Sequence, residues 1–289
     1  MNRNLTSTYI NPLTDFGFKK LFATESNKAL LIDFLNEIIK EEGCITDIKY
    51  QPTLQLGSTE ADRKAIFDIF CKTENGEFFI VEMQKARQPY FVDRSLFYST
   101  FPIQSQAPQG SWNFELKAVY TVALLDFKLF EDITDEDYFI EKIYLARERT
   151  KARYSKKLNF IFVELPKFKK NIEELKTNAD RWLYCFKHLG QLEGQPEELS
   201  GGVFETLFKE AEIKKLTHIE MEQYQKSVLE YSDVRDAVDY AMERGMERGI
   251  EKGQISKSFE IAKNLLNLHL SINDIVKTTG LTPEQILAL

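Results

Sequence analysis

The chain has 289 residues, of which 43% are hydrophobic and 12% aromatic, enough for a buried core and too many for a disordered protein. Its formal net charge of -7 is the wrong sign for a protein that coats nucleic acid, and no apolar run approaches the roughly 18 residues of a membrane span. The start of the sequence lacks the apolar stretch of a secretory signal, and three widely spaced cysteines form neither a disulfide framework nor a zinc motif. We therefore expect a reduced, cytoplasmic protein.

Hydrophobic periodicity predicts alternating helices and strands over the first 170 residues. Helices are expected over residues 14–22, along the apolar face from Leu30 to Ile39, and over residues 89–106, where Pro102 disturbs the pattern. The expected strands cover residues 48–56, 64–72, 77–85, 117–125, 140–145 and 160–163. This order predicts an α/β fold in which a mixed central sheet is flanked by helices.

The rest of the chain has helical patterns, with one helix expected around Trp182 and another over residues 204–216. A four-residue repeat follows at 242–253, with glycine at every fourth position. Because each glycine costs roughly 1 kcal/mol in a helix, the repeat predicts a weak helix or a hinge. A helix around residues 261–268 and two short helices end the sequence, the last beginning at Thr282 with the spacing of a capping box.

These patterns divide the chain into a core over residues 1–170, a helical extension over 171–241, and a glycine-repeat linker with a small helical tail over 242–289. Residues 1–190 hold 27 acidic and 27 basic residues, while the remaining residues hold 18 and 11, so the whole charge deficit lies toward the C-terminus. A basic patch lies within the neutral part and either meets phosphates or is an ordinary solvated surface. It consists of Arg147, Arg149, Lys151, Arg153, Lys156, Lys157, Lys167, Lys169 and Lys170.

Two β-rich runs between residues 66 and 85 flank the sequence Glu-Asn-Gly, which predicts a β-hairpin. The loop length decides which side chains share a face. A three-residue loop with Gly76 in the left-handed conformation pairs Asp68 with Glu82, whereas a two-residue loop pairs Asp68 with Met83.

Packing favours the three-residue loop. One face of the hairpin is then wholly apolar and consists of Phe67, Ile69, Cys71, Phe79, Val81 and Met83. The other register sets Glu82 beside Ile69 against the core, which costs several kcal/mol unless the charge is paired. We therefore predict that Asp68 lies opposite Glu82, with Gln84 on the same face.

Two carboxylates held side by side on rigid strands repel each other, and a divalent cation relieves that repulsion. Mg²⁺ prefers oxygen ligands, so we expect it to bind Asp68, Glu82 and the backbone carbonyl of Met83, with Mn²⁺ or Ca²⁺ as substitutes in binding. Such an ion polarises a phosphoryl oxygen and lowers the pKa of water for attack on a phosphodiester, and Gln84 could orient that water. The alternative is an ordinary exposed pair of strand residues, against which the apolar neighbours on the same face argue.

The pattern formed by Asp68, Glu82 and Gln84 resembles the PD-(D/E)XK nuclease superfamily, and the fuller sequence is similar to its transposase-like branch, which includes the recombination-promoting nucleases. The matching stretches are residues 14–22, 66–85, 90–94, 119–122 and 162–168 and the glycine repeat. The resemblance covers nearly the whole chain, and the combination of motifs is specific. It implies a restriction-endonuclease-like core, a metal held by Asp68 and Glu82, and DNA as the partner.

Two positions depart from the superfamily pattern. Phe67 stands in place of the proline, which we expect to be harmless. Gln84 stands in place of the usual lysine, a change that this branch shares. Because glutamine carries no positive charge, either another cation replaces the lysine or catalysis is slow. Lys85 follows directly, but strand alternation sends its side chain to the opposite face, so Lys85 is a secondary candidate.

Three further residues are secondary candidates. Asp15 is expected just before the first helix, where many nucleases of this fold have an extra acidic residue, and it is either a third metal ligand or a helix N-cap. Arg94 and Tyr98 are four residues apart on the expected helix over 89–106 and therefore share a face. They either contact phosphate or simply pack on each other at the surface.

The sequence over residues 271–287 resembles a helix-turn-helix, with Gly280 in the turn. Its second helix has no lysine or arginine, which is unfavourable for reading a major groove. We therefore expect the tail to bind a partner or to form a homo-oligomer.

Three functions compete on these grounds. A metal-dependent DNA endonuclease linked to mobile elements or DNA recombination is favoured by the intact Asp68 and Glu82. A catalytically weak or inactive protein of the same fold, which binds DNA or a partner, is favoured by the missing lysine. An assembly module that acts through the acidic helical tail is compatible with either.

Overall fold

The computed structural model describes residues 7–40, 43–55, 65–108, 110–130 and 138–289. The chain forms two compact units, residues 1–234 and 235–289. Within the described ranges, no helix combines the length and the apolar character needed to cross a membrane.

The centre of the first unit is a mixed six-stranded sheet in the order β1-β4-β5-β6-β8-β7. Its strands are β1 (Ile48–Tyr50), β4 (Ile69–Thr73), β5 (Phe78–Gln84), β6 (Val119–Leu125), β7 (Ile140–Tyr144) and β8 (Leu158–Glu164). Strand β6 runs parallel to β5 and β8, and the other neighbours are antiparallel. A separate two-stranded sheet pairs β2 (Leu54–Gln55) with β3 (Ala65–Ile66). The predicted α/β class with a mixed sheet is confirmed.

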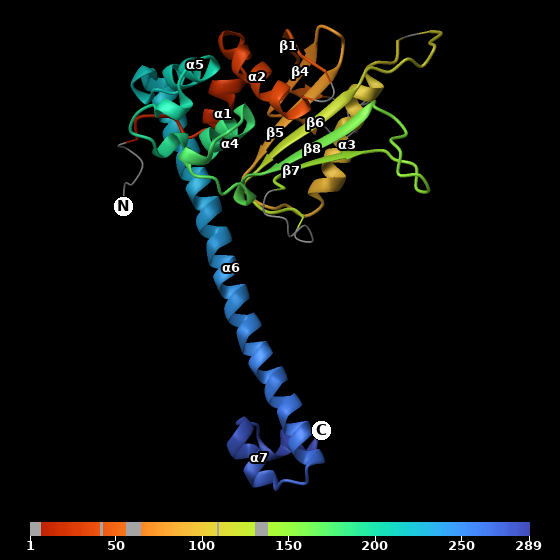
Figure 1. The fold of residues 1–289 in the computed structure, drawn as a ribbon, viewed down its shortest axis with the longest axis vertical. Helices are drawn as coiled ribbons and strands as arrows, with labels where there is room; N and C mark the ends of the chain where they lie inside the picture. Colours follow the sequence, from red (N-terminus) through yellow and green to blue (C-terminus); the bar gives the residue numbers. More distant parts are fainter. Residues whose placement is uncertain (1–6, 41–42, 56–64, 109, 131–137) are drawn as a thin grey trace. The chain divides into compact units, whose positions relative to one another are not determined.

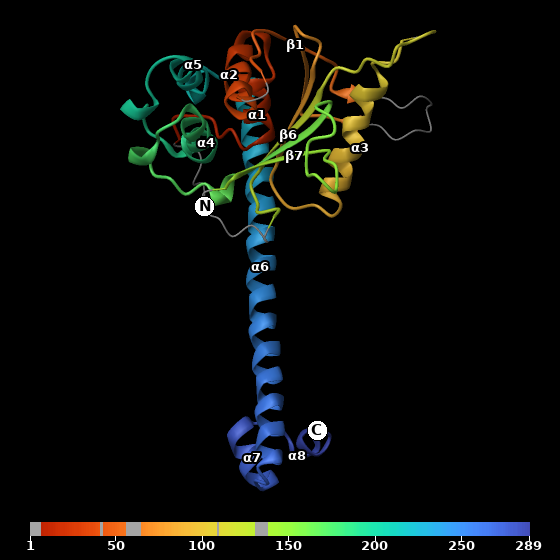
Figure 2. The ribbon, with the colours of Figure 1, turned by 45° about the vertical axis from the view of Figure 1, so that its right-hand side comes forward.

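Helices cover both faces of the sheet (Figures 1 and 2). One face is covered by α3 (Phe91–Gln104), and the other by α1 (Asp15–Phe22), α2 (Lys28–Ile39), α4 (Asn178–His188) and α5 (Val203–Glu210). Short 3-10 helices cover Glu25–Asn27, Leu165–Lys167, Ile172–Glu174, Leu189–Gln191, Glu197–Leu199 and Ile213–Lys215.

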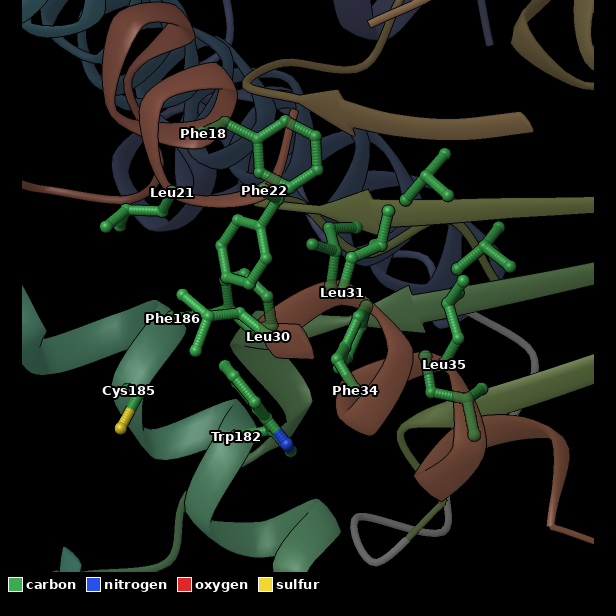
Figure 3. Packing of buried hydrophobic residues seen from close by; sticks show 14 of the residues in the cluster. Phe18, Leu21, Phe22, Leu30, Leu31, Phe34, Leu35, Trp182, Cys185 and Phe186 are labelled. Atoms are coloured by element: carbon green, nitrogen blue, oxygen red, sulfur yellow. The ribbon is translucent and has the colours of Figure 1, made fainter. Parts of the chain in front are cut away.

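The main hydrophobic core lies between the sheet and the four helices on one face (Figure 3). All six apolar residues of the predicted α2 face, from Leu30 to Ile39, are buried. Trp182 of α4 packs against Phe22 and Phe34, with ring centroids 5.8 and 5.9 Å away, and its indole N–H donates to Asp33 at 2.7 Å. Since a fully buried side chain of this kind contributes about 1.5–3 kcal/mol, this cluster fixes the helices against the strands that carry the candidate site.

The β4–β5 hairpin has the predicted register. Ile69 pairs with Val81, and Thr73 accepts and donates around a three-residue loop that ends at Gly76, whose φ is 87°. Asp68 lies one residue before β4, so the same register sets it across from Glu82.

Two expected strands are interrupted. The strand over 48–56 is divided into β1 and β2 around Pro52, which has no N–H to donate to a ladder. The strand over 64–72 is divided into β3 and β4 by a bend at Phe67 and Asp68. The backbone N–H of Phe67 donates to Thr53. The alternation therefore breaks, and Phe67 packs with Phe70 on the α3 side, so its predicted place beside Ile69 and Cys71 was wrong. Leu56 and Lys64, at the ends of these predicted strands, lie outside the described residues.

The C-terminal helices also differ from the expectation. The helix predicted over 204–216 ends at Glu210, and the glycine repeat is helical throughout, inside α6 (His218–Asn267), so the repeat is not a hinge. Two short helices, α7 (Ile272–Thr279) and α8 (Pro283–Leu287), pack on the end of α6 through Ala262, Ile275 and Ile286. The predicted capping box at Thr282 is confirmed.

Candidate active site

Asp68 is positioned by the bend between β3 and β4. Its Oδ2 accepts the backbone N–H of Met83 at 2.9 Å, a donor at the end of β5 that has no neighbouring strand residue in the β4–β5 ladder. Burial raises the pKa of the Asp68 carboxyl, while this hydrogen bond and the positive charge of Lys19 act in the opposite direction. The side chain is thus held firmly at the strand edge by the backbone it caps.

Glu82 lies on the sheet face beneath α3, and only 8% of the residue is exposed. Its Oε2 accepts a hydrogen bond from the Gln84 amide at 3.1 Å, whereas its buried Oε1 has no hydrogen-bond partner among the described residues. Burial, followed by the nearby negative charge of Asp68, raises the pKa of Glu82 to about 8. A carboxylate in this setting is short of positive charge, which is the property expected of a cation ligand.

Gln84 connects Glu82 to a positive charge on α3. Its Oε1 accepts from Nη2 of Arg94 at 3.0 Å, and Arg94 also donates to Gln88. The Arg94 guanidinium lies over the rings of Phe91 and Tyr98, 5.5 and 5.9 Å from their centroids. The predicted contact of Arg94 with Tyr98 is therefore present, and the Arg94 charge acts to lower the pKa of Glu82.

Asp15 and Lys19 stand on the first two turns of α1. The N-cap is Thr14, whose hydroxyl accepts from Gly17, so the prediction of Asp15 as the cap was wrong. Asp15 instead forms an ion pair with Lys19 at 2.8 Å, and the two charges act on the pKa of Asp68 in opposite directions. Sequence reasoning missed Lys19, although its i+4 spacing from Asp15 was visible.

Lys85 points away from Gln84, to the face on which the main core lies. Its ammonium lies 6.0 Å from the ring of Tyr231, whose hydroxyl donates to Asp126 at 2.6 Å. The positive charge of Lys85 nevertheless acts on Asp68, where it opposes the rise of the pKa caused by burial.

The basic stretch over 147–170 does not form one free surface. Lys167 is buried in an ion pair with Glu164 at 2.6 Å and donates to the carbonyl of Phe130 at 2.9 Å. The prediction that Lys167 meets phosphate was therefore wrong, because a neighbouring carboxylate in the sequence pairs with it inside the fold. Lys170 pairs with Asp180 at 2.7 Å, whereas Arg147, Arg149, Lys151, Lys156 and Lys157 are exposed.

The ligand set at the hairpin edge is small. Within the described ranges, no group of three or more His, Cys, Asp or Glu side chains is placed to hold a metal ion. Asp68 and Glu82 form a pair rather than a cluster, and the orphaned Oε1 of Glu82 fits a divalent cation that takes its remaining ligands from backbone oxygen and water.

A mixed sheet covered by helices on both faces, with an aspartate and a glutamate on adjoining strands, defines a restriction-endonuclease-like nuclease fold. The family described as PD-(D/E)XK nuclease family transposase matches residues 12–241, and the chain belongs to this family. No curated protein and no solved structure matches the chain.

Proposed function

We propose that the protein is a metal-dependent DNA endonuclease whose active site is built by Asp68 and Glu82. The observation that carries the proposal is the buried Oε1 of Glu82, which has no hydrogen-bond partner among the described residues and lies beside a second carboxylate. A buried, unpaired carboxylate is costly, and a divalent cation offsets that cost while binding the two side chains together.

Asp68 and Glu82 would hold the cation, which we propose to be Mg²⁺, with Mn²⁺ or Ca²⁺ as substitutes in binding. The Met83 carbonyl is proposed as a third ligand. A residue in an antiparallel ladder directs its N–H and C=O to the same side, and the Met83 N–H meets Asp68. The N–H of Phe67, the next candidate partner for that carbonyl, is occupied by Thr53. The chemistry supplied by such a cation is polarisation of a phosphoryl oxygen and a lower pKa for water.

Gln84 and Arg94 are proposed to supply what the usual lysine supplies in the superfamily. The Gln84 amide holds Glu82 through one end and Arg94 through the other, at 3.1 and 3.0 Å. A planar guanidinium suits a bidentate contact with phosphate, so Arg94 would stabilise charge on the DNA backbone. Tyr98 keeps the guanidinium in place from below.

Supercoiled plasmid incubated with the purified protein and Mg²⁺ or Mn²⁺ tests the proposal. We expect nicked and linear products with the parent chain and none with Asp68→Asn, Glu82→Gln or EDTA. Asp93→Asn, an exposed acidic residue on α3, is the matched control and should cut like the parent. If either site variant cuts like the parent, the assignment of the active site is wrong.

The family name also supports a role with mobile elements or DNA recombination, which we include in the proposal. The runner-up is a catalytically weak or inactive protein that binds DNA, favoured by Gln84 in place of lysine. A folded parent chain that binds plasmid but leaves it uncut with every cation would establish that alternative.

A further inference from the structure

Residues 238–253 of α6 carry a row of exposed apolar side chains. Met242, Met246 and Ile250 are 69%, 70% and 51% exposed, and Val238 is 38% exposed. Residues four apart are neighbours along one side of a helix, so these four side chains form a continuous row. All of them belong to the unit over residues 235–289.

A second row beside it consists of Gly245, Gly249 and Gly253. A Cβ atom at any of the three would meet nothing within 4 Å, so the chain itself places no steric demand for glycine there. Each glycine nevertheless costs roughly 1 kcal/mol in a helix. At 100° per residue, the glycine row lies about 60° from the apolar row, and the two rows together form a face on which another backbone can approach closely.

Two charged rows flank this face. The acidic row is Glu243, Glu247 and Glu251, and the basic row is Arg244, Arg248 and Lys252. The acidic row lies about 100° beyond the apolar row, and the basic row about 100° beyond the glycine row on the other side. Like charges four residues apart destabilise an isolated helix by roughly 0.2–0.5 kcal/mol per pair, so neither row stabilises a helix that stands alone.

We propose that this face of α6, residues 238–253, binds the same face of a second copy of the chain, with the two helices parallel and crossing at the glycines. Glycine at every fourth position allows backbones to approach, and interlocking of the rows of residues four apart gives a right-handed crossing near -40 to -50°.

Charge selects both the occupant and the direction. In a parallel pair related by a two-fold axis, the acidic side of one helix faces the basic side of the other, whereas an antiparallel pair sets like charges together. The face is thus complementary to itself, with three acidic residues matched by three basic ones. In the single chain Arg244 donates to the Tyr240 hydroxyl at 3.2 Å, a contact that pairing would exchange for a carboxylate.

The mass of the full chain in solution, measured by light scattering after size exclusion, tests the pairing. We expect about twice 33.7 kDa for the parent and a single chain for Gly249→Leu. Leucine is a better helix former than glycine, so circular dichroism should show undiminished helix in that variant. Gly194→Leu, the same change at an open position outside α6, is the control and should remain a dimer. A monomeric parent, or a dimeric Gly249→Leu, would overturn the proposal.

A charge-exchanged chain tests the direction. In it the three acidic residues of the flanking row become lysine and the three basic residues become glutamate. Parallel pairing predicts that this chain dimerises with itself but not with the parent, since the facing rows of a mixed pair carry like charge. Native mass spectrometry of the mixture should therefore show two homodimers only. A mixed dimer would refute the parallel arrangement.

Discussion

The Asp68 carboxylate is a candidate metal ligand and also the acceptor for a backbone donor. Repulsion between Asp68 and Glu82 alone suggests that removing either carboxylate would be neutral or stabilising. The hydrogen bond from the Met83 N–H at 2.9 Å adds an opposing effect for Asp68, because a shortened side chain leaves that N–H without an acceptor. Activity and stability can therefore be separated at this residue by the choice of substitution.

We predict that Asp68→Ala lowers the free energy of unfolding by about 1–3 kcal/mol, the cost of a buried donor left unpaired. Asp68→Asn keeps a carbonyl oxygen in place and should cost less, while both variants lose cleavage. Urea denaturation in EDTA measures the difference. Equal stability of the two variants would show that the contact with Met83 contributes nothing.

Glu82 gives the stability a pH dependence of known sign. Its pKa is raised from 4.5 to about 8 in the folded chain, so between these values the folded state holds a proton that the unfolded state has released. The stability from this group is complete below about pH 4.5 and is lost as the pH rises through 8.

In EDTA, we expect the melting temperature of the parent to fall between pH 5 and pH 9 relative to that of Glu82→Gln, which cannot ionise. Ca²⁺ should restore the parent at high pH and leave Glu82→Gln unchanged, since a bound cation favours the ionised carboxylate. Parallel melting curves for the two proteins at all pH values would contradict the prediction.

At the scale of elements, local rules succeeded where contacts are local. Turn chemistry and alternation were sufficient for the β4–β5 register, and the apolar periodicity was sufficient for the buried face of α2. They failed at Phe67, whose backbone pairs with Thr53, a partner that alternation within the hairpin does not reveal. The contact of Arg94 with Gln84 was also missed, because it depends on how α3 docks on the sheet.

The glycine repeat shows the opposite failure. Helix propensity predicted a weak helix or a hinge, yet the three glycines lie inside α6. Propensity counts only what a residue does within its own segment, and it omits any partner that the exposed row of Met242, Met246 and Ile250 contacts.

Gly76 gives a prediction for the hairpin. Its φ of 87° is a left-handed conformation in which a Cβ atom costs about 1–2 kcal/mol, so Gly76→Ala should lower the free energy of unfolding by that amount. The nearest atom is the flexible Lys117 side chain, at 3.3 Å from the added Cβ, which can move aside. Gly194→Ala, at an open position without a positive φ, is the control and should be neutral in urea denaturation.

At the scale of the whole molecule, the first turns of α6 belong to the nuclease unit. The hydroxyls of Tyr224 and Ser227 accept the backbone N–H groups of Asn11 and Phe16, at 2.9 and 3.1 Å. Farther along, Tyr231 donates to Asp126 at the end of β6. These contacts reach the segment that leads into α1 and the strand end beside Gln84, so the beginning of α6 supports the candidate site from both sides.

Two truncations separate the parts of α6. A chain ending at Ala241 retains these three contacts, and we expect it to fold, to cut plasmid at the rate of the parent per chain, and to have the mass of a single chain. A chain ending at Thr217 loses them and also the ion pair of Lys20 with Glu220, which leaves two backbone N–H groups without their acceptors. It should melt at a lower temperature and lose cleavage. If the chain ending at Ala241 is folded by circular dichroism but does not cut, the tail takes part in DNA binding, and the helix-turn-helix over 271–287 becomes its candidate contact despite having no basic residue in its second helix.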